Sequence, residues 1–128
     1  MQSEKPRLLI TSGEPAGIGP DLIIKLSQLD HQYDLTILAD ADLLLERANS
    51  LSMTVDIIDV SNISDSNFKT QKNSLKVLPI KLRNPCTAGK LDVSNATYVL
   101  EMLDIATDEC LSGNFNAVIT APIQKSVI

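Results

Sequence analysis

The sequence predicts an α/β protein with a mainly parallel sheet and helices on both faces. Short apolar segments rich in Val, Ile and Leu alternate with longer amphipathic segments along the 128 residues. Such alternation favours right-handed crossovers and parallel strand pairing. A loop with three glycines also separates the first apolar segment from the first amphipathic one. Parallel α/β sheets bind ligands beyond the carboxyl ends of their strands, where this loop is expected.

Five segments have the composition of buried strands. Each is rich in branched apolar residues and is bounded by Gly, Pro, Ser, Asn or Asp. They are residues 7–11, 34–39, 54–60, 75–80 and 116–122. Pro79 predicts that the fourth strand lies at a sheet edge or ends there, because proline has no N–H to donate.

Three segments have helical periodicity, and a polar stretch at 61–74 is predicted as a loop. The helices are expected at 20–29, 40–51 and about 93–111. The first has four apolar side chains that are predicted to form its buried face: Leu22, Ile23, Leu26 and Leu29. Gly113 is in position to end the third helix.

The composition excludes several classes of function. With 16 Asp and Glu against 11 Lys and Arg, the formal net charge is −5, and no basic cluster offers a face to nucleic acid. No apolar run approaches the roughly 18 to 20 residues of a membrane-spanning helix. The N-terminus does not have the pattern of a signal peptide. We therefore expect a cytoplasmic protein that binds neither nucleic acid nor membrane.

The cysteines and the histidine show no metal-ligand spacing. Cys86 and Cys110 lie far apart, without a CxxC pattern, and are expected to be free thiols in a reducing compartment. The single histidine, His31, has no Cys or His partner at ligand spacing. We expect no metal site in this chain.

The loop SGEPAGIGPD at 12–21 matches neither familiar phosphate-binding pattern. A P-loop requires GxxxxGK[ST], but counting from the first glycine of the loop places Ile18 at the second glycine position. A GxGxxG pattern that starts at Gly17 fails because Leu22 stands at the third glycine position. Asp40, after the second strand, suits either a ribose-binding acid or a helix cap.

The chemistry of the loop favours a neutral group over a phosphate. Gly17 and Gly19 allow close backbone approach, and Pro20 suits the first turn of a helix. Free N–H groups at a helix start attract anions, but Glu14 and Asp21 bring two carboxylates to the same place. We therefore expect a neutral ring, amide or ribose there, with a tight turn that binds nothing as the alternative.

The segment TAPIQK at 120–125 follows another predicted strand at the same sheet edge. Thr120 is either a hydroxyl at the cleft or an ordinary strand residue. Lys125 falls in the first turn of a predicted helix, where it is either a point charge for a phosphate or carboxylate or a solvated lysine. That helix breaks off after one turn, which predicts a truncated part of a longer protein.

The chain resembles the N-terminal half of the 4-hydroxythreonine-4-phosphate dehydrogenase family. Three segments carry the resemblance in the family's order: SGEPAGIGPDLIIKL at 12–26, LPIKLRNPCTAGKLDVSNATYVLEML at 78–103 and AVITAPIQKSVI at 117–128. The GIGP turn is also similar to that of isocitrate and isopropylmalate dehydrogenases. The resemblance implies that residues 1–128 are the N-terminal α/β portion of a two-domain enzyme with an isopropylmalate dehydrogenase-like fold.

The resemblance also implies an activity for the longer protein. It is the NAD-dependent oxidation of 4-phosphohydroxy-L-threonine, with decarboxylation, in pyridoxal 5′-phosphate synthesis by a homodimer. A divalent metal (Zn, Mg or Co) acts as the Lewis acid. The family's metal-binding histidines and phosphate-binding residues follow the TAPIQK segment, and His31 matches none of them. We therefore expect no catalytic residue, no tight cofactor binding and no activity in this chain.

Six residues match functional positions of the family: Glu14, Gly17, Ile18, Gly19, Thr120 and Lys125. The first four are expected on the cofactor side of the cleft, with Glu14 acting indirectly on cofactor or metal-bound water. The last two are expected to flank the substrate. The alternative is a non-catalytic α/β binding or self-association module that retains the half-fold. A small acyl- or phosphotransferase is disfavoured, because the only histidine lies in a polar stretch.

Overall fold

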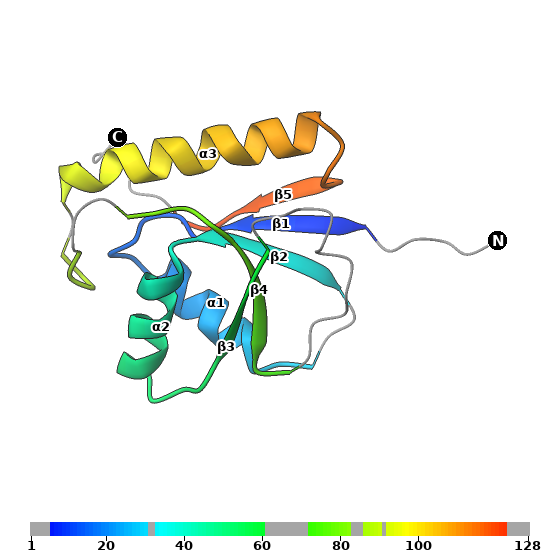
Figure 1. Cartoon of the computed structure of the whole chain (residues 1–128). Coiled ribbons are helices and arrows are strands. Elements are labelled where there is room, and N and C mark those ends of the chain that lie inside the picture. Colours follow the sequence, from blue (N-terminus) through cyan, green and yellow to red (C-terminus); the bar gives the residue numbers. More distant parts are fainter. Residues whose placement is uncertain (1–5, 31–32, 61–71, 83–85, 91, 123–128) are drawn as a thin grey trace.

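All five strands of the computed structural model run parallel, in the order β3-β4-β2-β1-β5 (Figure 1). The structure describes residues 6–30, 33–60, 72–82, 86–90 and 92–122. The strands are β1 (Arg7–Thr11), β2 (Asp34–Ala39), β3 (Asp56–Asp59), β4 (Ser74–Pro79) and β5 (Ala117–Thr120). The predicted parallel α/β sheet is confirmed, and the ends of the predicted strands move by two residues at most.

The helices also follow the sequence pattern. They are α1 (Gly19–Ser27), α2 (Ala41–Ser50) and α3 (Ala96–Leu111), and a 3₁₀ turn, η2 (Val93–Asn95), leads into α3. The Asp92 side chain caps the start of this turn, because it accepts a hydrogen bond from the Ser94 N–H at 2.9 Å. Gly113, with φ of +85°, follows Ser112, the C-cap of α3, and confirms the predicted helix end.

Helices cover both faces of the sheet, as predicted. Figure 1 shows α3 on one side of the sheet and α1 with α2 on the other. Because side chains alternate along a strand, neighbouring residues enter different cores. The core under α1 and α2 includes Ile10, Ile37, Val77, Ile24 and Leu44, and the core under α3 includes Leu9, Leu38, Tyr98, Met102 and Phe115.

The predicted buried face of α1 is partly wrong. Ile23 and Ile24 are buried against the sheet, but Leu22 is 49% exposed and Leu29 is 60% exposed. The helix begins with Gly19 packed against the end of β1, which turns the side containing Ile23 and Ile24 toward the sheet. Leu29 lies beyond the last residue of the helix.

Pro79 marks a strand end and not a sheet edge. It is the last residue of β4, and β4 lies between β3 and β2. The predicted loop at 61–74 lies mostly outside the described residues, and its last residue, Ser74, begins β4.

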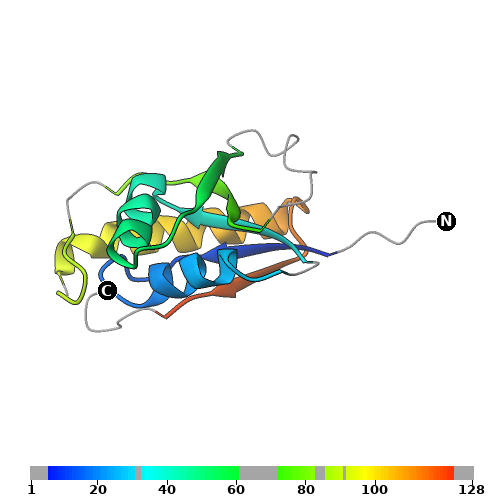
Figure 2. The same ribbon diagram turned by 90° about the horizontal axis from the view of Figure 1, so that it is seen from below.

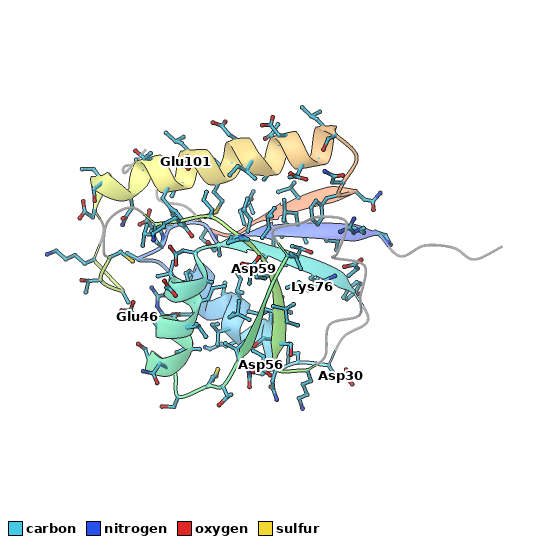
Figure 3. All side chains as sticks on the ribbon, in the orientation of Figure 1. Asp30, Glu46, Asp56, Asp59, Lys76 and Glu101 are labelled. Carbon is cyan, nitrogen blue, oxygen red and sulfur yellow. The ribbon has the colours of Figure 1, made fainter. Side chains whose placement is uncertain are left out.

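One buried lysine is held by an acidic partner at the opposite end of the sheet from the glycine loop. Lys76 on β4 is 1% exposed, and its Nζ lies 2.5 Å from Oδ1 of Asp34, at the start of β2 (Figure 3). Arg7 Nε lies 3.7 Å from the other oxygen of the same carboxylate. A buried ammonium requires such pairing, because removing it from water is costly. In the described part of the chain, no helix combines the length and apolar character needed to cross a bilayer.

Adjacent leucines of α2 provide a test of the core. Leu44 is 0% exposed, and Leu45 is 46% exposed. We expect Leu44→Ala to lower the free energy of unfolding by about 2–5 kcal/mol, because it leaves a cavity under α2. Leu45→Ala is the matched control and should change it by about 0.5 kcal/mol or less. Urea unfolding followed by circular dichroism measures both, and equal losses would contradict the assigned burial.

Candidate functional site at the glycine loop

The glycine loop (residues 12–18) joins β1 to α1 at the carboxyl edge of the sheet. Its neighbour is the end of β5, because Thr11 pairs with Thr120 and the Ala121 N–H donates to the Thr11 carbonyl at 3.1 Å. The Glu14 N–H donates to the Pro122 carbonyl at 3.1 Å. The sequence placed the loop and Thr120 at one edge of the sheet, and the register confirms that placement.

The protein's own backbone requires glycine at two positions, Gly13 in the loop and Gly19 at the start of α1. Gly13 has φ of +73°, and a Cβ there would lie 2.4 Å from the Pro122 carbonyl oxygen. A Cβ at Gly19 would lie 2.0 Å from the Ser12 carbonyl oxygen. Contacts this short exclude any side chain. At Gly19 the close approach inferred from the sequence is therefore an approach of the chain to itself, and Gly13 adds a second one.

Gly17 differs from these two glycines. A Cβ there would meet the Glu14 side chain at 3.4 Å, which is an ordinary contact distance, and its φ is not in the left-handed region. Internal packing therefore does not explain why this position has no side chain. Contact between Gly17 and a ligand therefore stays a prediction.

An arginine from α2 fixes the shape of the loop. Arg47 is 6% exposed, and its guanidinium donates to the carbonyls of Pro15 at 2.7 Å and Gly17 at 2.8 Å. It also donates to Oδ1 of Asp21 at 2.8 Å. A planar guanidinium suits this arrangement, because its five N–H groups point in fixed directions. The contact joins α2, the loop and the first turn of α1.

Arg47 also changes the electrostatics that the sequence suggested. The sequence places the carboxylates of Glu14 and Asp21 at one helix start, where both oppose an anion. In the structure the Asp21 carboxylate is paired with Arg47. Sequence reasoning missed this arginine because it lies in the amphipathic segment LLLERANS, where nothing local indicates that a charged residue is buried.

Glu14 points into the protein and not into solvent. It is 3% exposed, and Oε1 accepts hydrogen bonds from the Asn95 side chain at 3.3 Å and the Ala16 N–H at 3.5 Å. Among the described residues, Oε2 of Glu14 and Oδ1 of Asn95 have no hydrogen-bond partner. Glu14 therefore contacts the loop and η2 from inside the protein, and an indirect role toward a ligand stays a prediction.

Three of the predicted site residues lie on the surface of this edge. Ile18 is 59% exposed, Gly17 is partly exposed, and Thr120 is exposed at the end of β5. Gly19 is buried in the first turn of α1. Lys125 lies outside the described residues, as does His31.

Asp40 is a helix cap. Its Oδ1 accepts from the Leu43 N–H at 3.0 Å, and its Oδ2 accepts from the Leu82 N–H at 2.6 Å. Both carboxylate oxygens are therefore engaged by the protein's own backbone, and the residue is 9% exposed. Of the two interpretations left open by the sequence, this geometry supports capping and not ribose binding.

Tyr98 connects α3 to the same edge. It is 2% exposed, and its hydroxyl accepts from the Asp40 N–H at 2.8 Å and lies 3.5 Å from the Ser12 hydroxyl. Burial raises the pKa of Tyr98 to about 12. Burial also raises the pKa of the Cys86 thiol, so the environment does not favour a reactive thiolate. Cys86 and Cys110 are both free, as predicted.

The described residues do not fit the divalent metal that the resemblance implies. Among them no group of three or more His, Cys, Asp or Glu side chains is arranged to hold a metal ion. The carboxylates of this edge are already engaged by backbone N–H groups, by Asn95 or by Arg47. No metal ligand is therefore assigned here.

The fold and the loop define a class of protein: a parallel α/β protein with a candidate site at the carboxyl edge of its sheet. Comparison with protein families narrows this class. The family model described as pyridoxal phosphate biosynthetic protein PdxA matches residues 31–128. The chain belongs to the PdxA family.

Curated relatives are named 4-hydroxythreonine-4-phosphate dehydrogenase. The protein from Erwinia tasmaniensis is 47% identical over 124 residues, which cover 97% of this chain and 37% of that protein. The protein from Saccharophagus degradans is 46% identical over 121 residues, which cover 94% of this chain and 36% of that protein. The chain therefore spans little more than a third of the length of these relatives.

Solved structures support the fold. A 4-hydroxythreonine-4-phosphate dehydrogenase from Burkholderia phymatum superposes with a TM-score of 0.87 at 19% identity, over 98% of this chain and 38% of that one. The enzyme of the same name from Klebsiella pneumoniae gives a TM-score of 0.84 at 21% identity, over 96% of this chain and 39% of that one. At these identities the likeness shows the fold alone.

The Arg47 contact predicts a specific pattern of mutational effects. Arg47→Met removes three charge-assisted hydrogen bonds, so we expect a loss of about 3 kcal/mol or more in the free energy of unfolding. Arg47→Lys should recover less than half of it, because an ammonium cannot satisfy the same acceptors in one plane. Urea unfolding and amide exchange at Gly17 measure the effect. Lys25→Met, on the exposed side of α1, is the control and should leave the stability nearly unchanged. An Arg47→Lys variant as stable as the parent chain would contradict the role of the guanidinium in holding the loop.

The buried tyrosine predicts an alkaline instability. The folded-state pKa of Tyr98 is near 12, above the ordinary value of 10. The contribution of its protonated phenol to the free energy of unfolding is therefore at its full value below about pH 10. This contribution, on the order of 2–3 kcal/mol, is lost as the pH rises from about 10 to about 12. Urea unfolding across this range should show the decline in the parent chain. Tyr98→Phe should lack that component, and parallel pH profiles for the two proteins would contradict it.

Proposed function

We propose that this chain is the N-terminal α/β portion of a two-domain PdxA-type dehydrogenase that oxidises 4-phosphohydroxy-L-threonine with NAD. The observation that carries the proposal is the match to a dehydrogenase that is 47% identical over 97% of the chain. Decarboxylation, a divalent metal, homodimeric assembly and a cytoplasmic location belong to the same proposal. Bound NAD supplies the hydride acceptor.

The chain's own residues contribute binding surface and positioning. Gly17 and Ile18 form the exposed part of the loop and are proposed to contact the cofactor, while Arg47 holds the loop in shape beneath them. A preformed loop lowers the conformational entropy lost on binding. Gly19 and Glu14 support that loop from inside. No metal ligand comes from the described residues, and no catalytic residue is proposed in the chain.

Thr120 and Lys125 are proposed to flank the substrate. Thr120 lies at the end of β5 beside the loop, and its exposed hydroxyl can donate a hydrogen bond to a substrate oxygen. Lys125 follows five residues later and supplies a positive charge for a phosphate or carboxylate. The alternative is a non-catalytic binding or self-association module, which is favoured by the exposed apolar side chains of α1 and β5.

A chimera tests the proposed function. The matched region of the Erwinia tasmaniensis protein is replaced with this chain, and NADH formation is followed with 4-phosphohydroxy-L-threonine and Zn, Mg or Co. We expect the chimera to turn over and the 128-residue chain alone to show no activity. Turnover by the chain alone would overturn the expectation of an inactive part. A folded chimera without turnover would contradict the dehydrogenase proposal.

Within the chimera, Thr120→Val tests the substrate contact. Loss of a hydrogen bond to a charged substrate is expected to lower kcat/KM roughly tenfold or more. Thr107→Val is the matched control, because the Thr107 hydroxyl is exposed on α3 and donates to the Leu103 carbonyl of its own helix. Equal effects of the two substitutions would count against a substrate role for Thr120.

A further inference from the structure

A carboxylate and an amide meet inside the protein, between the glycine loop and the start of α3. Asn95, the last residue of η2, is 0% exposed, and its Nδ2 donates to Oε1 of Glu14 at 3.3 Å. Figure 2 shows that α3 begins at the same end of the molecule as α1, which follows the loop. The contact therefore joins two segments whose residues lie 81 positions apart in the chain.

Asn95 does not cap α3, although its position favours capping. It is the N-cap residue of this helix, where an asparagine oxygen ordinarily accepts a hydrogen bond from an N–H of the first turn. Here the side chain makes no capping hydrogen bond. The amide is instead directed to Glu14, so the residue serves this distant contact and not its own helix.

Two acceptor atoms of the contact are buried without a donor. In the part of the chain that the structure describes, Oε2 of Glu14 and Oδ1 of Asn95 have no hydrogen-bond partner. The two residues are 3% and 0% exposed. Each orphaned oxygen shares its carbon with an atom of the Glu14–Asn95 hydrogen bond. Buried polar atoms without a partner require an explanation, such as a bound ion or water.

The charges around this contact are mainly negative. Burial is the largest cause of the raised pKa of the Cys86 thiol. Among the charges that this thiol senses, one is positive, that of Arg47, and three are negative: Glu46, Glu14 and Asp40. A negative potential of this kind attracts cations.

The positive groups of this edge do not compensate Glu14. Arg47 is engaged by Asp21 and by two carbonyls of the loop. The starts of α1 and α3 add partial positive charge, but within the described residues none of their N–H groups donates to Oε2.

We propose that Glu14 and Asn95 bind a monovalent cation, with Oε2 of Glu14 and Oδ1 of Asn95 as its side-chain ligands. Carboxylate and carbonyl oxygens are the usual ligands of hard cations. One bound positive charge compensates the one buried carboxylate, which is otherwise costly to remove from water. The cation thereby stabilises the contact between the loop and η2.

The same observations disfavour water and a divalent ion as the occupant. A water molecule can donate to both oxygens, but it leaves the charge of Glu14 uncompensated. Among the described residues, no group of three or more His, Cys, Asp or Glu side chains is arranged for a metal ion. The proposed site is therefore separate from the site of the divalent metal that the family resemblance implies.

Stability in different salts tests the site. At about 0.2 M salt, the equilibrium constant for folding should be about tenfold higher in KCl than in choline chloride, because an ion that binds only the folded state stabilises it. Equal ionic strength keeps charge screening the same in both salts. Parallel urea unfolding in NaCl and NH4Cl identifies which cation binds. Equal stability in all four salts would overturn the proposal.

Glu14→Gln separates the cation from a purely structural role. The variant replaces Oε2 with an N–H donor and removes the charge, so it should be less stable than the parent in KCl. In choline chloride it should be at least as stable, because an uncompensated buried charge is gone. Glu46→Gln makes the same chemical change at an exposed position of α2 (Figure 3) and should keep the salt dependence of the parent. The same loss for Glu14→Gln in both salts would contradict cation binding.

Nuclear magnetic resonance provides a direct measurement that needs no variant. The side-chain N–H signals of Asn95 should shift with KCl concentration and reach saturation, and they should not do so with choline chloride. Identical shifts in the two salts would overturn the proposal. Both measurements concern the folded chain and not turnover. An inactive chimera would therefore contradict the proposed function and leave the cation site supported.

Discussion

The close backbone approach between the glycine loop and its neighbours is the constraint on which the carboxyl edge of this structure depends. Gly13 leaves room for the Pro122 carbonyl, and Gly19 leaves room for the Ser12 carbonyl. Because α1 begins at Gly19, this contact decides where the helix starts and which side meets the sheet. The contact between Gly13 and Pro122 brings the end of β5 beside the loop, so two segments that are distant in the sequence lie at one edge of the sheet.

Two buried side chains then connect the remaining helices to this edge. Arg47 joins α2 to the loop through two carbonyls and Asp21, and Tyr98 joins α3 to the first residue of the loop and to the cap of α2. Both replace hydrogen bonds to water with directed contacts inside the protein. The loop is thus supported from both faces of the sheet, which is the rigidity that a binding loop requires.

On the β5 side of the molecule, apolar side chains are exposed at the surface. There the sheet ends in an uncharged strand, and α1 exposes leucine and isoleucine beside it, although the protein as a whole is acidic. The prediction that Leu22 and Leu29 are buried is wrong because apolar periodicity alone does not fix which side of a helix meets the sheet.

Local patterns were sufficient for the approximate ends of the strands and for the helix end at Gly113, because these depend on residues near in sequence. The alternation of strands and helices predicted the parallel sheet. The meeting of the loop with Thr120 also followed from strand ends sharing one edge. Tertiary structure alone decided which apolar stripe of α1 meets the sheet and that Arg47 is buried. The reason is that Gly17 and Pro15, the acceptors of Arg47, lie about 30 residues before it in the chain, and no local period records a contact that only the packing of α2 against the loop creates.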